Sequence, residues 1–386
     1  MRIVDVCAFY SPCGGGISTY IDAKFRCVRE LGHELIVIAP AEREEVTEIS
    51  PGAILVGVAA PTMPFDRRYR YFHSAERLHR ELDRWHPDHV ECSSPWSSAS
   101  AVARWRGGAT RSLFMHSDPM AAYAYRWFGS LSRSFVDSLF SRFWDHMRFL
   151  GRSFDILVSP SSQLAQRLRG RGLGNVATVP LGVDEGFSQA NRDEDLRATL
   201  LWGLGLPPSA TLLLSVGRIS PEKRPRMIID AVRQASGSRR LGLLMIGDGP
   251  MRQKLERLAG RGPVRLYPHT HDRRLLARTV ASCDALVHGC EAETFGLVVA
   301  EALASGTPVI VPDRGGAFEQ MKPGQGLSYT SGSTAALARA IGQFADLQPA
   351  ALHVPESLSK PRRIHDHFRE LLAFYQALAG GPIAPA

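Results

Sequence analysis

The stretch that decides the fold runs from Glu291 to Val309 and reads Glu-Ala-Glu-Thr-Phe-Gly-Leu-Val-Val-Ala-Glu-Ala-Leu-Ala-Ser-Gly-Thr-Pro-Val. It carries two carboxylates, Glu293 and Glu301, separated by seven mostly apolar residues. The pattern predicts a helix over Phe295–Ser305, ended by a glycine and followed by a strand over Pro308–Val311. At roughly 1.5 Å per residue, the two carboxylates lie about 12 Å apart along this helix. That span is comparable to a sugar, a diphosphate and a ribose laid end to end, with the helix N-terminus facing the anionic middle.

Length and composition indicate a globular protein with two domains. The chain has 386 residues, of which 44% are hydrophobic, enough to fill two cores of ordinary size. No window approaches the roughly 18 uninterrupted apolar residues of a membrane span. The first apolar run contains Asp5, which a signal peptide would not tolerate, so we expect a cytoplasmic protein.

The charge of the chain calls for an anionic partner. With a formal charge of +8 and a pI near 9.4, the protein could bind nucleic acid, a phospholipid surface or a nucleotide substrate. Composition alone does not distinguish these three partners. The cysteines show no paired C-x-x-C spacing, which argues against a zinc site and against a disulfide framework. We expect ordinary reduced thiols at Cys7, Cys13, Cys27, Cys92, Cys283 and Cys290.

A glycine-rich turn follows the first predicted strand, Arg2–Tyr10, and opens a helix that ends near Gly32. Backbone N–H groups at such a turn can approach a phosphate closely, so Gly14, Gly15 and Gly16 are candidates to hold a diphosphate. The alternative is a plain tight turn. The dinucleotide fingerprint G-x-G-x-x-G is not present here.

Strands then alternate with helices in two successive series, which predicts parallel doubly wound sheets. The first series has strands at 33–40, 53–59, 89–94, 111–115 and 155–159, and helices at 73–85 and 162–169. The polar run 191–195 fits a boundary between domains. The second series has strands at 211–216, 241–246, 264–267, 284–288 and 326–329, and helices at 334–345 and 362–379.

Two groups of polar residues lie at predicted strand ends, where open α/β folds bind ligands. His116 and Asp118 follow the strand that ends at Met115, although a lone histidine there is often structural. Arg218 leaves the first strand of the second series and Lys223 precedes the next helix. Two such cations can neutralise a diphosphate without a metal ion, and a surface salt bridge is the alternative.

Two stretches suggest a membrane surface. Pro64–Phe72 interleaves aromatic and basic residues on what we interpret as an exposed loop, which fits anionic lipid head groups, or simply a solvated loop. Val136–Leu150 has the periodicity of an amphipathic helix with flanking arginines. Such a helix either covers a sheet or lies on a membrane.

In their order along the chain, these motifs resemble those of the family 4 retaining glycosyltransferases. They are Gly14–Gly16, Pro180–Asp184, Gly217–Arg218 with Lys223, Gly247–Gly249, and the two glutamates followed by Gly306 and Pro308. The resemblance implies the GT-B fold, in which two Rossmann-like domains face each other across a cleft and a C-terminal helix crosses back to the first domain. We expect domains at 1–185 and 186–355, with 356–386 forming the returning helix and a frayed tail.

The resemblance also implies roles for individual residues. Arg218 and Lys223 would hold the donor diphosphate, with Gly15 and Gly16 approaching it from the other domain. Glu301 would accept hydrogen bonds from the ribose, while Glu293 and His116 contact the transferred sugar and Asp118 lies on the acceptor side. Phe295 and Gly296, between the glutamates, would line the donor site.

The chain departs from the family pattern near the nucleotide base. The family usually has a glycine after the strand 264–267 and a Pro-Ser pair at positions 288–289, whereas this chain has Pro268-His269 and His288-Gly289. The choice between a UDP and a GDP donor therefore stays open. Retention of the anomeric configuration is implied by the family. The chain offers no D-x-D motif at a strand end, so we expect no metal and no other cofactor.

The leading hypothesis is transfer of a hexose from a nucleotide diphosphate sugar to a lipid acceptor, with peripheral contact at the inner face of the membrane. A soluble sugar or polysaccharide acceptor is the second hypothesis. A catalytically inactive nucleotide- or carbohydrate-binding protein is the alternative from another class. We do not expect nucleic acid as a partner, because the basic residues are spread over many helices.

Overall fold

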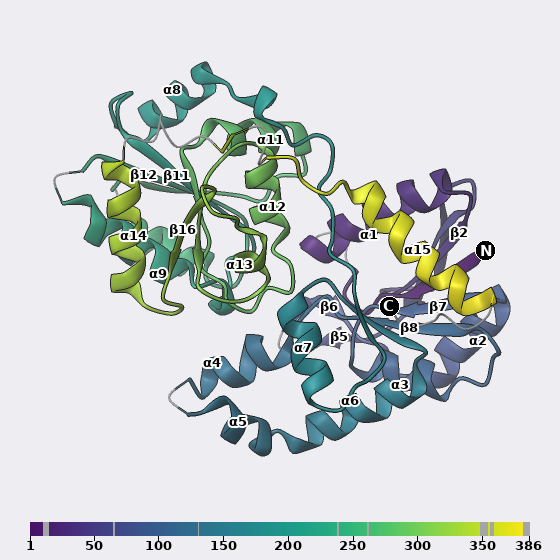
Figure 1. Cartoon of the computed structure of the whole chain (residues 1–386). Coiled ribbons are helices and arrows are strands. Elements are labelled where there is room, and N and C mark those ends of the chain that lie inside the picture. Colours follow the sequence, from purple (N-terminus) through teal and green to yellow (C-terminus); the bar gives the residue numbers. More distant parts are fainter. Residues whose placement is uncertain are drawn as a thin grey trace. The chain divides into compact units, whose positions relative to one another are not determined.

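The computed structural model describes residues 1–10, 15–64, 66–129, 131–237, 239–260, 262–347, 354–355 and 359–380. The chain forms two compact α/β units, both drawn in Figure 1. Unit 1 comprises Met1–Met120, Trp127–Pro180 and the C-terminal segment from Ile364. Unit 2 comprises Ala121–Arg126 and Leu181–Arg363. The predicted alternation of strands and helices is present in both units.

Unit 1 is built on an eight-stranded sheet in the order β10-β9-β8-β7-β1-β2-β4-β3. All neighbouring strands are parallel except β3, which pairs antiparallel with β4. The strands are β1 (Arg2–Val6), β2 (Glu34–Ala41), β3 (Glu45–Ser50), β4 (Ala53–Ala59), β7 (His89–Cys92), β8 (Thr110–Phe114), β9 (Ile156–Ser159) and β10 (Val176–Thr178). The sequence did not predict β3, because it is a largely exposed edge strand and its residues are mostly polar.

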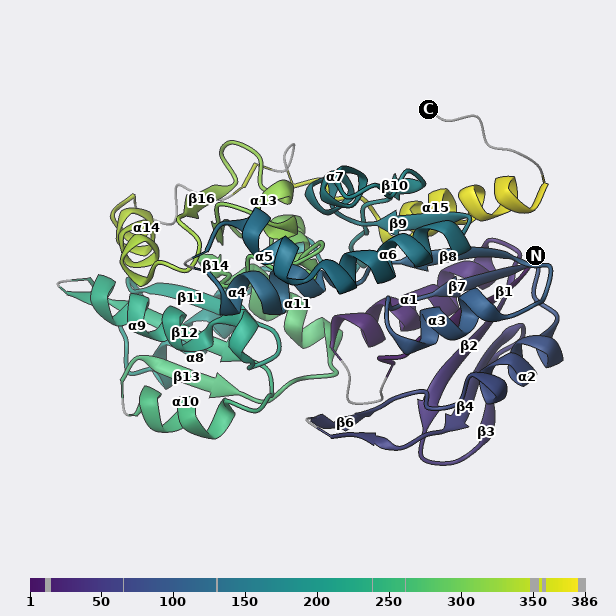
Figure 2. The ribbon, with the colours of Figure 1, turned by 90° about the horizontal axis from the view of Figure 1, so that it is seen from below.

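The helices of unit 1 include one from the far end of the chain. They are α1 (Gly16–Glu30), α2 (Ala75–Trp85), α3 (Ser97–Arg104), α5 (Arg133–Leu139), α6 (Ser141–Ser153), α7 (Ser162–Gly170) and α15 (Ile364–Gly380). A further short helix, α4 (Tyr125–Trp127), spans the change from unit 2 to unit 1. Helix α15 contacts α1 and β8 (Figures 1 and 2). Its side chains Phe368, Leu371 and Tyr375 are fully buried.

A group of buried charges lies inside unit 1. The Lys24 ammonium donates hydrogen bonds of 2.7 Å to both Asp5 and Glu91, and all three side chains are fully buried. The Tyr375 hydroxyl of α15 donates to the same Glu91 oxygen over 2.7 Å. The last helix therefore completes a polar network whose other members come from α1, β1 and β7.

The two stretches assigned to a membrane surface differ from their predicted form. The segment from Val136 is broken at Phe140 into α5 and α6, and its predicted apolar stripe is largely internal, with Val136, Trp144 and Leu150 buried. Pro64–Phe72 is not a loop throughout: β6 (Asp66–Arg70) pairs antiparallel with β5 (Thr62–Met63). Strand β6 extends to Tyr69 and Arg70, which are half-buried, because such side chains pack well on an extended backbone.

Unit 2 is built on a six-stranded parallel sheet in the order β13-β12-β11-β14-β15-β16. The strands are β11 (Thr211–Val216), β12 (Leu241–Ile246), β13 (Val264–Tyr267), β14 (Ala285–Val287), β15 (Val309–Pro312) and β16 (Gly326–Tyr329). The helices are α8 (Glu194–Gly203), α9 (Pro225–Ser236), α10 (Arg252–Ala259), α11 (Arg273–Ser282), α12 (Leu297–Ala304), α13 (Gly316–Gln320) and α14 (Thr334–Asp346).

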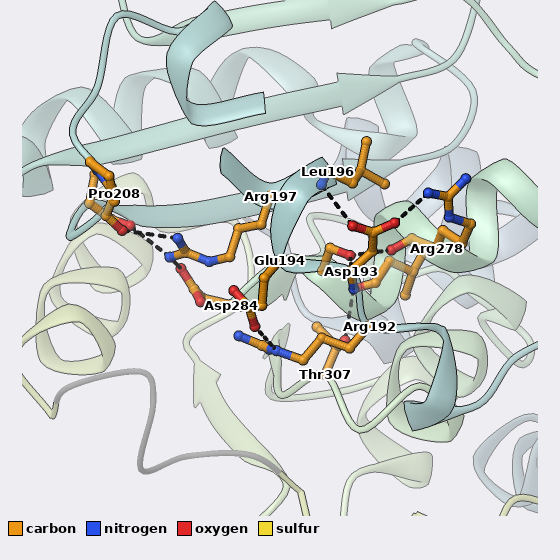
Figure 3. A network of polar contacts seen from close by, with 12 residues as sticks. Arg192, Asp193, Glu194, Leu196, Arg197, Pro208, Arg278, Asp284 and Thr307 are labelled. Carbon is orange, nitrogen blue, oxygen red and sulfur yellow. Dashed lines mark hydrogen bonds and ion pairs between the residues drawn. The ribbon is translucent and has the colours of Figure 1, made fainter. Parts of the chain in front are cut away.

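Hydrogen bonds of Asp193, in the polar run 191–195, and of Arg197 connect the start of α8 to the rest of unit 2 (Figure 3). Asp193 caps α8 by accepting from the Leu196 N–H over 2.8 Å, and its other carboxylate oxygen accepts from Arg278 of α11. Arg197 donates to Asp284 over 2.8 Å, and Asp284 also accepts from the backbone N–H of Leu212 over 2.7 Å. These bonds connect α8 to β11 and to the start of β14.

Candidate active site

An ion pair at the carboxyl edge of the unit 2 sheet joins two of the predicted site residues. Lys223, after β11, donates a hydrogen bond to the carboxylate of Glu293, which follows β14. Burial alone would lower the pKa of Lys223, but the Glu293 carboxylate raises that pKa well above its usual value. Burial acts to raise the pKa of Glu293, but Lys223 holds that pKa below its usual value. Both side chains are therefore charged at neutral pH.

A glycine brings the two chain segments of this ion pair together. A Cβ atom at Gly289 would lie 2.5 Å from the backbone oxygen of Lys223, so only glycine allows this approach. Next to it, Arg224 has a φ of 50° and donates to Glu291 over 2.7 Å. Arg218 lies two residues after the end of β11 at the same sheet edge, and its carbonyl accepts from the Ser220 N–H over 3.0 Å.

His288 lies beside the ion pair. Its Nε2 is 3.5 Å from Glu293 Oε1, and its carbonyl accepts from the Tyr329 hydroxyl over 2.8 Å. Burial lowers the pKa of His288 to about 4, so the imidazole is neutral at neutral pH. His288, Cys290 and Glu293 each offer one atom that can ligate a metal ion, and these three atoms lie within 4.8 Å of one another.

The helix between the two glutamates is shorter than predicted, because α12 begins at Leu297. Gly296 has a φ of 85°, a conformation that favours glycine and sets the entry to the helix. The Gln320 amide donates to the carbonyls of both Phe295 and Gly296 and so fixes this turn. Without a side-chain cap on α12, N–H groups of its first turn are available to an anion.

The second glutamate has a partner that the sequence did not suggest. Glu301 is 6% exposed, and its carboxylate accepts a 2.6 Å hydrogen bond from Arg273 at the start of α11. The Arg273 guanidinium lies over the Phe187 ring, 4.7 Å from its centroid. Burial raises the pKa of Glu301 above its usual value, although Arg273 acts in the opposite direction. In the sequence, Arg273 is one of two adjacent arginines after a helix-capping aspartate, and nothing distinguishes it from a surface residue.

In unit 1, His116 lies just beyond β8 with its ring among aromatic side chains. The ring centroids of Phe114 and Tyr20 are 4.4 Å and 4.8 Å away. Burial, with the positive charge of Lys24 and the nearby His367, lowers the pKa of His116 to about 3. The neutral ring can donate a hydrogen bond from one nitrogen and accept at the other, which suits contact with a sugar hydroxyl.

Asp118 and the glycine turn complete the predicted residues of unit 1. The Asp118 carboxylate is buried and accepts from Arg167 of α7, a partner that the sequence did not suggest. Gly15 precedes α1, and a Cβ at that position would meet no atom of the described residues within 4 Å. Gly16 is the first residue of α1 and is exposed. Gly14 lies outside the described residues.

Two α/β units of this kind, one carrying a Glu-x7-Glu helix beside a basic turn, define a glycosyltransferase of the GT-B class. Residues 14–187 match the model of Glycosyltransferase Family 4, and residues 197–358 match that of Glycosyl transferases group 1. The chain belongs to the family 4 glycosyltransferases.

Three known proteins show how far this similarity extends. The chain is 29% identical over 369 residues, 94% of its own length and 89% of the relative's, to the GDP-mannose-dependent alpha-(1-6)-phosphatidylinositol dimannoside mannosyltransferase of Mycobacterium tuberculosis. It is 30% identical to a GDP-mannose-dependent alpha-mannosyltransferase of Mycolicibacterium smegmatis, over 84% of this chain and 82% of that one. The structure of sucrose-phosphate synthase from Thermosynechococcus elongatus aligns with a TM-score of 0.71 at 19% identity, covering 99% of this chain and 100% of that one, which shows the shared fold.

Within the described part of the chain, no helix combines the length and the apolar character needed to cross a bilayer.

Proposed function

We propose that this protein transfers mannose from GDP-mannose to a lipid acceptor at a membrane surface, with retention of the anomeric configuration. The observation that carries the proposal is the similarity, over nearly the whole chain, to a GDP-mannose-dependent enzyme that acts on a phosphatidylinositol dimannoside. The charged pair of Lys223 and Glu293 at a sheet edge supports it, because it offers a cation for a diphosphate and a carboxylate for sugar hydroxyls.

The proposed reaction exchanges one bond at the anomeric carbon for another. The acceptor hydroxyl forms the new bond to that carbon, the bond to the diphosphate oxygen breaks, and the hydroxyl proton passes to the departing diphosphate on the same face of the sugar. Arg218, Lys223 and the N–H groups at the start of α12 stabilise the charge on the diphosphate. Glu301 binds the ribose, with Phe295 and Gly296 lining the donor site. Glu293 binds the transferred sugar.

In this proposal, residues of unit 1 contact the transferred sugar and the acceptor. Neutral His116 contacts a hydroxyl of the transferred sugar, and Asp118, held by Arg167, lies on the acceptor side. Gly15 and Gly16 are both exposed and offer their backbone to the phosphate or the sugar.

An exposed apolar surface on unit 1 supports a lipid acceptor. Trp127, Phe135 and Leu139 are 63%, 58% and 57% exposed, and we call them the α4–α5 surface. Asp137, the acid within this segment, is buried and accepts from Arg171. Exposed apolar side chains without exposed acids suit the interface of an anionic membrane.

The first experiment tests the donor. Calorimetric titration of the full chain with GDP and with UDP, each with EDTA present, is expected to show binding of GDP. Release of GDP from GDP-mannose in the presence of phosphatidylinositol mannosides then tests turnover. Tight binding of UDP alone would contradict the mannose donor, and binding of neither nucleotide would favour an inactive carbohydrate-binding protein.

The second experiment tests the membrane. The protein is expected to float with vesicles of phosphatidylcholine containing an anionic lipid, and the double variant F135S/L139S to float less. Trp202→Ser is the matched control, because Trp202 is 83% exposed on α8 of unit 2 and lies outside the α4–α5 surface. Flotation that is equal for both variants, or absent in the unaltered protein, would favour a soluble sugar or polysaccharide acceptor.

A further inference from the structure

Three potential metal ligands lie in one short turn after β14. His288 Nε2 or Nδ1, the Cys290 thiol and a Glu293 carboxylate oxygen lie within 4.8 Å of one another. His288 is 5% exposed and Cys290 is 2% exposed, while Glu293 is partly open. Imidazole nitrogen, thiolate sulfur and carboxylate oxygen form a ligand set typical of zinc.

The Nε2 atom of the His288 imidazole lies beside the Glu293 carboxylate. Nε2 of His288 is buried and makes no hydrogen bond to any of the residues that the structure describes. The distance from Nε2 to Glu293 Oε1 is 3.5 Å. A buried ring nitrogen without a hydrogen bond is unusual in a folded protein and points to a missing ligand.

The backbone that carries the three groups is already fixed. The Tyr329 hydroxyl binds the His288 carbonyl over 2.8 Å, and Gly289 packs against the Lys223 backbone. Ligands of a tetrahedral zinc ion lie about 3.5 Å apart, given bonds of about 2.0–2.3 Å. Small side-chain shifts from the observed spacing therefore suffice to bind an ion.

We infer that His288, Cys290 and Glu293 bind Zn²⁺ or a similar soft divalent cation, and that this ion inhibits sugar transfer. On binding, the thiol releases its proton to water and forms a sulfur–metal bond, and a fourth position stays open to water. The ion and the Lys223 ammonium compete for the same carboxylate oxygen of Glu293. An ion at this site thus withdraws Glu293 from Lys223. The inhibitory part of the inference rests on the proposed function, whereas the binding part does not.

Cobalt reports the site directly, because a thiolate bound to Co²⁺ gives a charge-transfer absorption in the near ultraviolet. Titration of the full chain with Co²⁺ is expected to produce this band with one ion per chain, and Zn²⁺ to abolish it. Cys290→Ser and Cys290→Ala should remove the band. Cys283→Ser, which alters another buried thiol of unit 2, should retain it. A thermal melt establishes that each variant is folded. Absence of the band in the unaltered protein, or its persistence in either Cys290 variant, overturns the site.

Two further measurements test the competition and the inhibition. Because the Lys223 ammonium opposes the ion, Lys223→Ala is expected to bind Co²⁺ about tenfold more tightly, and unchanged or weaker binding contradicts the competition. Zn²⁺ should inhibit mannose transfer by the unaltered protein, reversibly by EDTA, and leave Cys290→Ser unaffected. Transfer that is insensitive to zinc overturns the inhibition even if cobalt binds. Loss of the proposed function would instead appear as no transfer from any donor, with the cobalt band still present.

Discussion

The Arg273 guanidinium binds the carboxylate of Glu301 over 2.6 Å, although the two residues lie 28 positions apart in the chain. The guanidinium also lies over the face of the Phe187 ring. Glu301 is buried, and this hydrogen bond from Arg273 stabilises the charge and the orientation of its carboxylate. We therefore regard Arg273 as a positioning residue for the carboxylate assigned to the ribose.

Replacement of Arg273 by glutamine is expected to weaken donor binding. The buried Glu301 carboxylate would lose its cation, and its pKa would rise further, so it would accept ribose hydrogen bonds less well. We expect KM for the nucleotide sugar to rise about tenfold with a smaller effect on kcat, in steady-state assays at several pH values. Arg274→Gln, at the exposed neighbouring position, is the control. An equal rise of KM in both variants would contradict the specific role of Arg273.

Replacement of Lys223 by alanine is expected to reduce kcat/KM about 10²–10³-fold, the usual effect of removing one group that stabilises developing charge. The variant leaves Glu293 partly buried without its cation, so part of the effect comes from the carboxylate. Comparison with E293Q and with the double variant in a thermodynamic cycle separates the two contributions. Lys254→Ala on α10, an exposed position, is the matched control. Full activity of Lys223→Ala would refute the diphosphate assignment.

Gly289→Ala is expected to impair the donor site by moving the Lys223 backbone. The new methyl group would lie 2.5 Å from a carbonyl oxygen, a contact that only a backbone shift can relieve. We expect a loss of about 1–3 kcal/mol in the free energy of unfolding, as for other overpacked sites, together with weaker binding of GDP. Gly203→Ala on α8 meets no atom within 4 Å and is the control. Denaturant unfolding and calorimetry measure the two effects.

The stability of unit 1 is expected to depend on pH through Glu91. Burial raises its pKa from 4.5 to about 7, with Lys24 acting in the opposite direction. The folded state therefore binds more protons than the unfolded state between these values, and the free energy of unfolding falls as pH rises from 4.5 through 7. Denaturant unfolding between pH 5 and 8 should show this decline, and Glu91→Gln should flatten it. A profile of equal slope in both proteins would show that another group is responsible.

Four strands of unit 2 were predictable because their sequence signal is local. Strands β11, β12, β13 and β16 have the predicted ranges, since each is a short run bounded by turn residues. The polar edge strand β3 was not found, nor was the helix α8, whose polar start was interpreted as a domain boundary. The break at Phe140 was also missed, because the apolar period continues from α5 into α6.

For the candidate site, the sequence indicated the ends of strands but not the pairs formed there. Glu293 was chosen for its spacing to Glu301 and Lys223 for its place before a helix, and their ion pair depends on β11 and β14 being neighbours. Arg273 was missed because its partner is brought close only by the packing of α11 against α12. The sequence around Cys290 has no C-x-x-C spacing. Only the conformation of the turn after β14 shows that His288 and Glu293 lie close enough to bind a metal ion together with this cysteine.

The contribution of α15 to unit 1 sets the order in which the protein matures on the ribosome. Every residue of unit 2 is translated before Phe368 and Tyr375 exist, and these two side chains fill the interior of unit 1. The first unit to begin synthesis is thus the last to be completed. A nonsense mutation at the codon of Ile364 would leave unit 2 whole, yet deprive Glu91 of its Tyr375 partner and open the unit 1 core to water and to quality-control proteases.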